Sequence, residues 1–179
     1  MMENLDDIIV MKVGPHSDMS LDEIIESKNK EEILNNVHYW GYSGVFCRQK
    51  QVQEFCKNSA LNNNSPKLVL IETKSSYNSD IGFINEYSVD NINYEKFKYP
   101  VQLQGAQFSF VAKNLRKYDK FKLDDFIVVG GKNDGKPLSE HLVFRVNKCF
   151  GKYIGNSDDN EINVLIADLV EPYAVWLRE

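Results

Sequence analysis

A regular alternation of apolar and polar residues beyond residue 99 constrains the fold of this chain most strongly. Val101 and Leu103 alternate with glutamines, and Phe108 and Phe110 alternate with Gln107 and a serine. Side chains two positions apart share one face of a β-strand, so this pattern predicts strands with one apolar face. Further short apolar runs predict strands at residues 8–13, 67–72, 125–129, 141–150, 162–170 and 173–177. Residues 67–179 are therefore predicted to be β-rich.

The N-terminal third instead carries helix signals. Ser20 followed by Glu23 forms a capping box, which predicts a helix start. The apolar stripe of this helix is predicted to comprise Leu21, Ile24, Ile25, Ile33 and Leu34. A second helix is predicted over residues 48–60. We therefore expect one α+β domain over residues 1–179, with two helices within residues 1–66 packed against a small, strongly bent mixed sheet or β-barrel.

Lys28 interrupts the apolar stripe of the first predicted helix. It lies one turn after Ile24 and Ile25, on the face that is expected to meet the core. Two interpretations remain open. The lysine either extends its ammonium to the surface or points into a polar pocket beside the core, where it would bind a ligand.

The segment over residues 38–47 indicates the wall of a ligand pocket. It combines Trp40, Tyr42 and Phe46 with two glycines and a thiol. Aromatic rings offer faces on which a planar ligand stacks, and glycine lets a backbone approach a ligand closely. We therefore predict ligand contacts from Trp40, Gly41, Tyr42, Ser43 and Gly44. The alternative is that the aromatic rings simply seal the core.

Cationic and polar residues elsewhere complete the predicted site. His16 lies in a loop between a strand and a capped helix, and Arg48 lies at the predicted start of the second helix. With Lys28 and Trp40 they would form a phosphate pocket. The polar face of the alternating strands adds Gln104 and Gln107 as predicted ligand contacts, with a solvated sheet face as the alternative. Arg145, on the strand predicted at 141–150, is a further predicted contact; it faces either away from the core or into the mouth of a barrel.

Charge and cysteine content restrict the partners. The formal net charge is −5, which disfavours long nucleic acid as a partner. Basic residues cluster only at residues 113–122, a stretch that fits either a short anionic ligand or a solvated loop or helix face. The chain carries three irregularly spaced cysteines and no apolar run of membrane-spanning length. We expect a cytoplasmic protein with no membrane partner, metal site or cofactor; homo-oligomerisation is left open.

A catalytic alternative rests on Cys47 and His16. Cys47 precedes a predicted helix, and a helix N-terminus lowers the pKa of a thiol. His16 could act as the base that activates it. We expect no catalytic residue in the leading hypothesis, and these two in the alternative.

Residues 121–128, followed by residues 141–146, resemble the PUA-like superfamily, which includes the ASCH and EVE modules. Members of this superfamily often enter a strand through a hydrophobic-x-x-Gly-Asp motif and follow it with an x-Phe-x-Val strand. Asp124 stands here where that motif has glycine. The resemblance implies a barrel-like fold with an aromatic-walled pocket for a nucleobase or modified nucleotide.

These observations favour non-catalytic binding of a small, planar, anionic ligand, most simply a nucleotide. One specific form is a sponge, a small phage or bacterial protein that sequesters a cyclic-nucleotide or ADP-ribose-type immune signal in an anti-defence role. The alternatives are a nucleotide-processing enzyme that uses Cys47 or His16 and a PUA-like reader of RNA or modified DNA.

Overall fold

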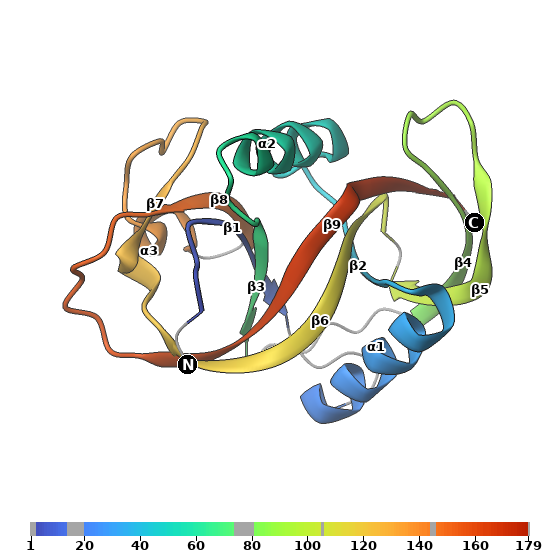
Figure 1. Ribbon diagram of the computed structural model, residues 1–179, viewed down its shortest axis with the longest axis horizontal. Coiled ribbons are helices and arrows are strands. Elements are labelled where there is room, and N and C mark those ends of the chain that lie inside the picture. The colour runs from blue at the N-terminus through green and yellow to red at the C-terminus, as the bar shows by residue number, and fades with distance from the viewer. Residues whose placement is uncertain (1–2, 14–19, 74–80, 105, 144–145, 179) are drawn as a thin grey trace.

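The computed structural model describes residues 3–13, 20–73, 81–104, 106–143 and 146–178 (Figure 1). The fold is α+β, as predicted. Its elements in chain order are β1 (Asp7–Val13), α1 (Leu21–Asn35), β2 (His38–Tyr42), α2 (Gln49–Leu61), β3 (Lys67–Glu72), β4 (Ile81–Ser88), β5 (Glu95–Gln104), β6 (Phe108–Phe121), the 3-10 turn η1 (Leu123–Asp125), β7 (Phe126–Val128), α3 (Leu138–His141), β8 (Lys148–Tyr153) and β9 (Ile162–Arg178).

The described strands form one mixed sheet of nine strands. The path runs β2-β6-β9-β3-β1-β8-β7, with β4 attached to β9 and β5 attached to β4. β1 and β3 are parallel, and the other pairs are antiparallel. The sheet is larger than predicted, and the described ladders leave it open at β2, β5 and β7.

Two long strands organise the molecule. β6 has 14 residues and β9 has 17, and they run together diagonally across it (Figure 1). β9 pairs with β3 through Leu165–Asp168 and with β4 through Trp176–Arg178, so it changes neighbour along its length. Its side chains enter all three buried apolar clusters. The two strands therefore connect the halves of the molecule through a common ladder.

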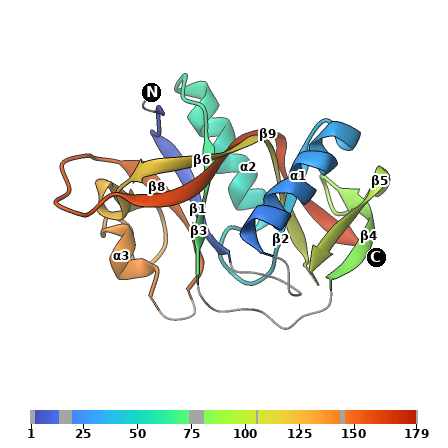
Figure 2. The ribbon, with the colours of Figure 1, turned by 90° about the horizontal axis from the view of Figure 1, so that it is seen from below.

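The helices lie at separate positions around the sheet. α1 lies at one end of the molecule and α3 at the other, with α2 between them (Figure 2). Within the described residues, none of the helices combines the length and the apolar character that a membrane span requires.

The predicted N-terminal elements are confirmed, with one error in α1. Ser20 is the N-cap, and its hydroxyl accepts a hydrogen bond from the Glu23 N–H. Ile24 is buried, but the side chains of Ile33 and Leu34 are 80% and 47% exposed. The predicted stripe is wrong at that end because the last turn of α1 extends past the core.

Three further segments differ from the prediction. Residues 81–88 and 95–104 form a β-hairpin, whereas no strand was predicted between residues 72 and 99. Most of the basic stretch 113–122 belongs to β6 and is therefore neither loop nor helix. The strand predicted at 141–150 starts only at Lys148, since His141 ends a helical turn.

Candidate functional site

The aromatic segment over residues 38–42 is a buried strand. Trp40 and Tyr42 are each only 5% exposed. The Tyr42 ring stacks on Phe110 with centroids 4.2 Å apart, and its hydroxyl donates to the Cys47 carbonyl oxygen. In the described structure Trp40 and Tyr42 therefore belong to the core, as the alternative of a sealed core expects for Trp40, whereas Phe46 is 40% exposed and does not seal it.

Lys28 is buried beside β2, so its ammonium does not reach the surface. The ammonium donates to the Tyr39 carbonyl oxygen and lies 3.4 Å from a Glu31 carboxylate oxygen. Glu31 in turn accepts from the Tyr39 N–H at 2.8 Å. The two α1 side chains thus satisfy the backbone groups that Tyr39, on an edge strand, turns away from β6. Burial lowers the pKa of Lys28 and raises that of Glu31, while their attraction opposes both shifts.

Packing explains the first glycine of the segment. A Cβ placed on Gly41 would lie 2.9 Å from the Ala106 Cβ and 3.3 Å from Leu103. Gly41 therefore lets β2 approach the end of β5 closely. Gly44 is different: it is exposed, its φ is +101°, and a Cβ there would meet nothing within 4 Å. Its backbone conformation is what favours glycine.

Cys47 lies in the turn before α2 but does not have the character of a nucleophile. Its side chain is 2% exposed, and burial raises the pKa of its thiol well above the ordinary value. Lys148, which lowers that pKa slightly, donates at 2.9 Å to the Ser43 carbonyl oxygen. Arg48 is the exposed N-cap of α2. The described structure therefore does not present the activated thiol that the catalytic alternative requires.

The other predicted ligand contacts lie far from one another or fall outside the residues that the structure describes. His16 and Arg145 fall outside the described residues, and so does the side chain of Gln104. Gln107 is exposed, and its backbone N–H donates to the Ser43 hydroxyl at 3.2 Å. Besides Ser43 and Gln107, the described structure brings together Lys28 and Trp40 of the predicted set, with the ammonium 5.1 Å from the ring centroid.

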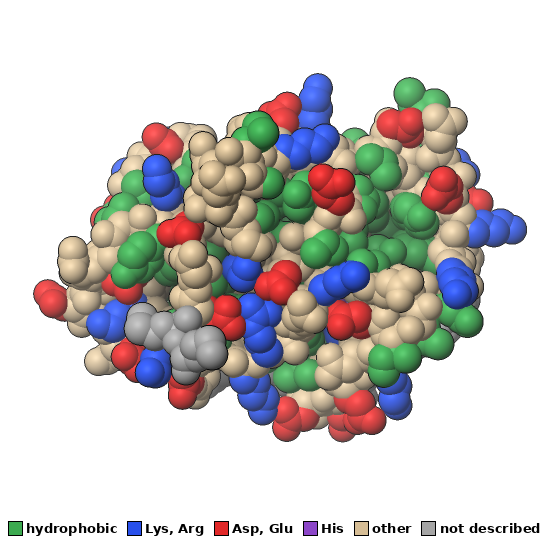
Figure 3. All heavy atoms as spheres, in the orientation of Figure 1, with side chains coloured by type: hydrophobic (Ala, Val, Ile, Leu, Met, Phe, Trp, Pro, Cys, Tyr) green, Lys and Arg blue, Asp and Glu red, His purple; other side chains and the backbone are tan. Residues whose placement is uncertain are grey.

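The basic stretch along β6 is neutralised in part. Arg116 forms two hydrogen bonds with Glu3, at 2.8 and 3.0 Å, and contacts Asp168 at 3.2 Å. Lys117 lies 3.4 Å from Asp22. Figure 3 shows Lys and Arg side chains interspersed with Asp and Glu on this face of the molecule. This face therefore does not show the single-sign basic surface typical of proteins that grip long nucleic acid.

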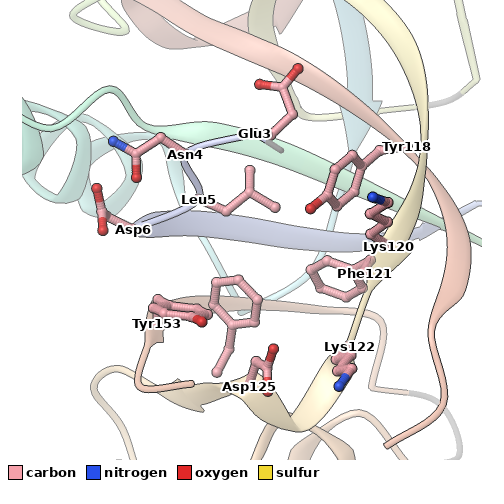
Figure 4. Close-up of a pocket in the computed structure, with 11 residues that line it drawn as sticks. Glu3, Asn4, Leu5, Asp6, Tyr118, Lys120, Phe121, Lys122, Asp125 and Tyr153 are labelled. Atoms are coloured by element: carbon pink, nitrogen blue, oxygen red, sulfur yellow. The ribbon is translucent and has the colours of Figure 1, made fainter. Parts of the chain in front are cut away.

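A cavity of about 200 Å³ opens beside the C-terminal end of β6 (Figure 4). Its walls are formed by residues 3–6, the end of β6 and the strands β7 and β8. Five of the eleven lining side chains are aromatic or apolar, five are charged and one is an asparagine (Figure 4): Glu3, Asn4, Leu5, Asp6, Tyr118, Lys120, Phe121, Lys122, Asp125, Phe126 and Tyr153.

An irregularity in the strand brings two aromatic rings of β6 to this cavity. Tyr118 and Phe121 are three positions apart and would face opposite sides of a regular strand. The pairing of β6 with β9 shifts register between these two residues, so both rings line the cavity. Phe121 stacks on Phe126 with centroids 5.3 Å apart, and Tyr153 packs edge-on against Phe126 at 5.5 Å. The floor is therefore aromatic, but Phe121 and Phe126 are only 1% and 2% exposed, so its accessible surface comes from Tyr118 and Tyr153.

The charges around the cavity are unequally compensated. Both carboxylate oxygens of Glu3 accept from Arg116, and these hydrogen bonds hold the pKa of Glu3 below its ordinary value. Lys120 and Lys122 form no ion pair with any residue that the structure describes. The cavity thus offers ammonium groups beside aromatic rings, which is the chemistry that an anionic planar ligand needs.

Sequence reasoning did not find this cavity. It considered residues 113–122 only for their basic side chains and predicted no site residue within 151–160. The aromatic residues Tyr118 and Tyr153 inside those polar stretches were the available signal. Their convergence with residues 3–6 depends on contacts between distant parts of the chain.

Within the residues that the structure describes, no group of three or more His, Cys, Asp or Glu side chains is placed to hold a metal ion. Comparison of this chain with protein-family models, curated proteins and solved structures finds no match.

Proposed function

We propose that this protein binds a small, planar, anionic ligand, a nucleotide, in the cavity between residues 3–6 and β6, and releases it unchanged. The observation that carries the proposal is the combination of an aromatic floor with two lysines that lack ion-pair partners among the described residues. Stacking of a base on an aromatic side chain contributes about 1–3 kcal/mol, and the lysines supply attraction for phosphate.

The size of the cavity supports a ligand that is only partly enclosed. A volume of about 200 Å³ is smaller than the roughly 300–1,000 Å³ typical of sites that enclose a drug-sized molecule. A base would occupy it, and the sugar and phosphate would extend past the rim. Lys120, which is exposed at that rim, would then meet the phosphate.

The chemistry of the lining favours binding over turnover. Among the described residues that line the cavity, none is Cys, His or Ser. All three cysteines are buried, and burial raises the pKa of each thiol. We therefore infer sequestration or recognition of the ligand rather than covalent catalysis.

A thermal-shift and calorimetry panel of mono-, di- and cyclic nucleotides and ADP-ribose tests this proposal. Ligand at 100 times its dissociation constant adds about 2.7 kcal/mol of stability, which raises the midpoint by several degrees. Mass spectrometry of the recovered ligand should show it intact, and a converted ligand would make the protein an enzyme. Tyr118→Ala should abolish the shift, whereas Tyr99→Ala, an exposed tyrosine outside the cavity, should leave it unchanged. No shift with any nucleotide contradicts the proposal.

We further propose that the sheet approaches a closed, PUA-like barrel. The close approach of Gly41 to Ala106 and Leu103 supports it, because it brings the open edges of β2 and β5 together. One buried apolar cluster also gathers side chains from β2, β4, β5, β6 and β9: Tyr39, Ile84, Phe97, Val101, Leu103, Val111 and Val175. Closure is possible only at the Gly41 end of β2, because α1 side chains already bind the backbone of Tyr39 on β2 and of Tyr99 on β5. Slow hydrogen exchange of the Gly41 and Leu103 amides would support closure there, and rapid exchange of both would refute it.

A further inference from the structure

Backbone hydrogen bonds fix the turn that follows β8 to the walls of the cavity. The Tyr153 N–H donates to the Asp6 carbonyl oxygen at 2.8 Å. The N–H groups of Ile154 and Gly155 donate to the Asp125 carbonyl oxygen at 2.8 and 3.0 Å. Because Asp6 and Asp125 both line the cavity, the backbone of this turn is held in place relative to it.

The Tyr153 side chain folds back over the same turn. Its ring packs edge-on against Phe126, with centroids 5.5 Å apart, and the residue is 47% exposed. The hydroxyl end of the ring lies against Gly155. A Cβ built on Gly155 would lie 3.0 Å from the Tyr153 hydroxyl oxygen and 3.3 and 3.4 Å from two ring carbons. The ring therefore occupies the space that any other residue at position 155 would need.

Glycine suits position 155 for two separate reasons. Its φ is +74°, a left-handed conformation that residues with a Cβ rarely adopt. The missing side chain also leaves room for the Tyr153 ring. Gly131 separates the two reasons, because its φ is +73° but a Cβ there would meet nothing within 4 Å. Within this pair, only Gly155 combines the left-handed backbone with contact to a side chain of the cavity.

A side chain at position 155 is expected to move the ring rather than the backbone. Hydrogen bonds hold the backbone of the turn, whereas the Tyr153 ring is nearly half exposed and can rotate into solvent. The new Cβ would approach the two ring carbons more closely than the roughly 3.5–4.0 Å at which non-bonded carbon atoms pack best. Rotation of the ring relieves this contact and removes the ring from the cavity wall.

Resting on the proposed function, we infer that Gly155 is a positioning residue for the ligand. It keeps the Tyr153 ring in the cavity wall, where the ring provides a stacking surface. Tyr153 and Tyr118 reach the cavity from different strands, β8 and β6 (Figure 4). Because Phe121 and Phe126 are almost fully buried, these two tyrosines supply the accessible aromatic surface. Gly155 acts through Tyr153 and needs no contact with the ligand itself.

Calorimetry with two glycine variants tests this inference. Each member of the panel of mono-, di- and cyclic nucleotides and ADP-ribose that binds the wild-type protein is titrated into Gly155→Ala and into Gly131→Ala. Both variants carry the same backbone strain, so a general loss of stability would affect them equally. Gly155→Ala should weaken binding about fivefold or more, the lower end of what one base–aromatic stack contributes, and Gly131→Ala by less than about twofold. Equal affinities of the two variants overturn the inference.

Substitutions of Tyr153 test whether the ring carries the effect. Tyr153→Ala should weaken binding as much as Gly155→Ala, and combining the two should cause no further loss. Tyr153→Phe removes the hydroxyl that lies closest to position 155 but keeps the ring, so it should bind as the wild type does. Gly155→Ala/Tyr153→Phe should regain part of the affinity that Gly155→Ala loses. A full further loss on adding Gly155→Ala to Tyr153→Ala overturns the inference.

Failure of the proposed function and failure of this inference are distinguishable. If no nucleotide of the panel binds the wild-type protein, the proposed function is refuted, and the ring position is still measurable by NMR. Nuclear Overhauser effects between the Tyr153 and Phe126 rings are expected in the wild-type protein and in Gly131→Ala, and should weaken in Gly155→Ala. Unchanged effects in Gly155→Ala overturn the inference whether or not a nucleotide binds.

Discussion

At the scale of single residues, β2 contains buried polar groups that do not all have hydrogen-bond partners in the described structure. His38 is fully buried, and its Nδ1 lies 3.1 Å from a Glu32 carboxylate oxygen. Its Nε2 and the Trp40 Nε1 have no hydrogen-bond partner in the described structure. Burial lowers the pKa of His38 to about 4, with the neighbouring Lys28 adding to the shift and Glu32 opposing it. The imidazole is therefore neutral in the folded protein at physiological pH, with Nδ1–H donating to Glu32.

This buried histidine predicts acid sensitivity. The unfolded chain takes up a proton at His38 near its ordinary pKa of 6.5, whereas the folded chain does so only near pH 4. The folded state thus binds fewer protons within this window, and the free energy of unfolding falls by about 3 kcal/mol as the pH drops from 6.5 to 4. Urea denaturation at successive pH values measures the slope.

His38→Asn provides the comparison for that slope. The amide still donates to Glu32 but does not titrate, so the variant should show a flatter pH dependence whatever its baseline stability. Glu31 acts in the opposite sense, since its raised pKa means that acid favours the folded state. Identical slopes in the two proteins would show that His38 is not the source of acid sensitivity.

At the scale of elements, β2 is an edge strand protected by its surroundings. Lys28 and Glu31 of α1 occupy the Tyr39 backbone groups that would otherwise pair with another chain. The edge strand β5 carries lysines and a proline, which are residues that discourage edge-to-edge pairing. Gly41 completes the arrangement by allowing the end of β5 to pack over β2.

Gly41→Ala should therefore destabilise the protein. Alanine ordinarily stabilises a strand relative to glycine by about 0.5–1 kcal/mol. Here the new Cβ would lie 2.9 Å from the Ala106 Cβ, and overpacking of this kind costs about 1–3 kcal/mol, so the clash dominates. Urea denaturation measures the loss. The double variant Gly41→Ala/Ala106→Gly removes the opposing Cβ and should recover part of it; unchanged stability of the single variant would disprove the close approach.

At the scale of the whole molecule, β6 and β9 make the protein one structural unit. Phe110, Phe121 and Val111 of β6 belong to three different apolar clusters. β9 likewise contributes to each of them, through Leu165, Val164 and Val175 among others. Loss of either strand would expose all three clusters at once.

We therefore expect a single cooperative unfolding transition. Tryptophan fluorescence reports on Trp40 and Trp176, which both pack in the apolar cluster that contains Phe110 and Leu165. Far-UV circular dichroism reports on the whole backbone. The two urea transitions should coincide, and amides of the β6–β9 ladder should share the slowest hydrogen exchange. Separate midpoints would show that the two ends of the molecule unfold independently.

Local sequence signals determined the α+β class, β1, β3, the start of α1 at Ser20 and the extent of α2, because caps and short-range periodicity act within a few residues. They could not determine that Trp40 and Tyr42 are core residues or that Lys28 binds the β2 backbone. Those outcomes depend on which strand lies beside which.

For the candidate site too, the sequence predicted the kinds of side chain, and only the tertiary structure decided where they meet. The expectation of aromatic and cationic side chains around a planar anionic ligand came from composition in short stretches. The cavity itself joins Leu5, Tyr118 and Tyr153, which are far apart in the chain. Only the tertiary structure brought them together, because register shifts in β6 and long-range pairing decide which side chains share a surface.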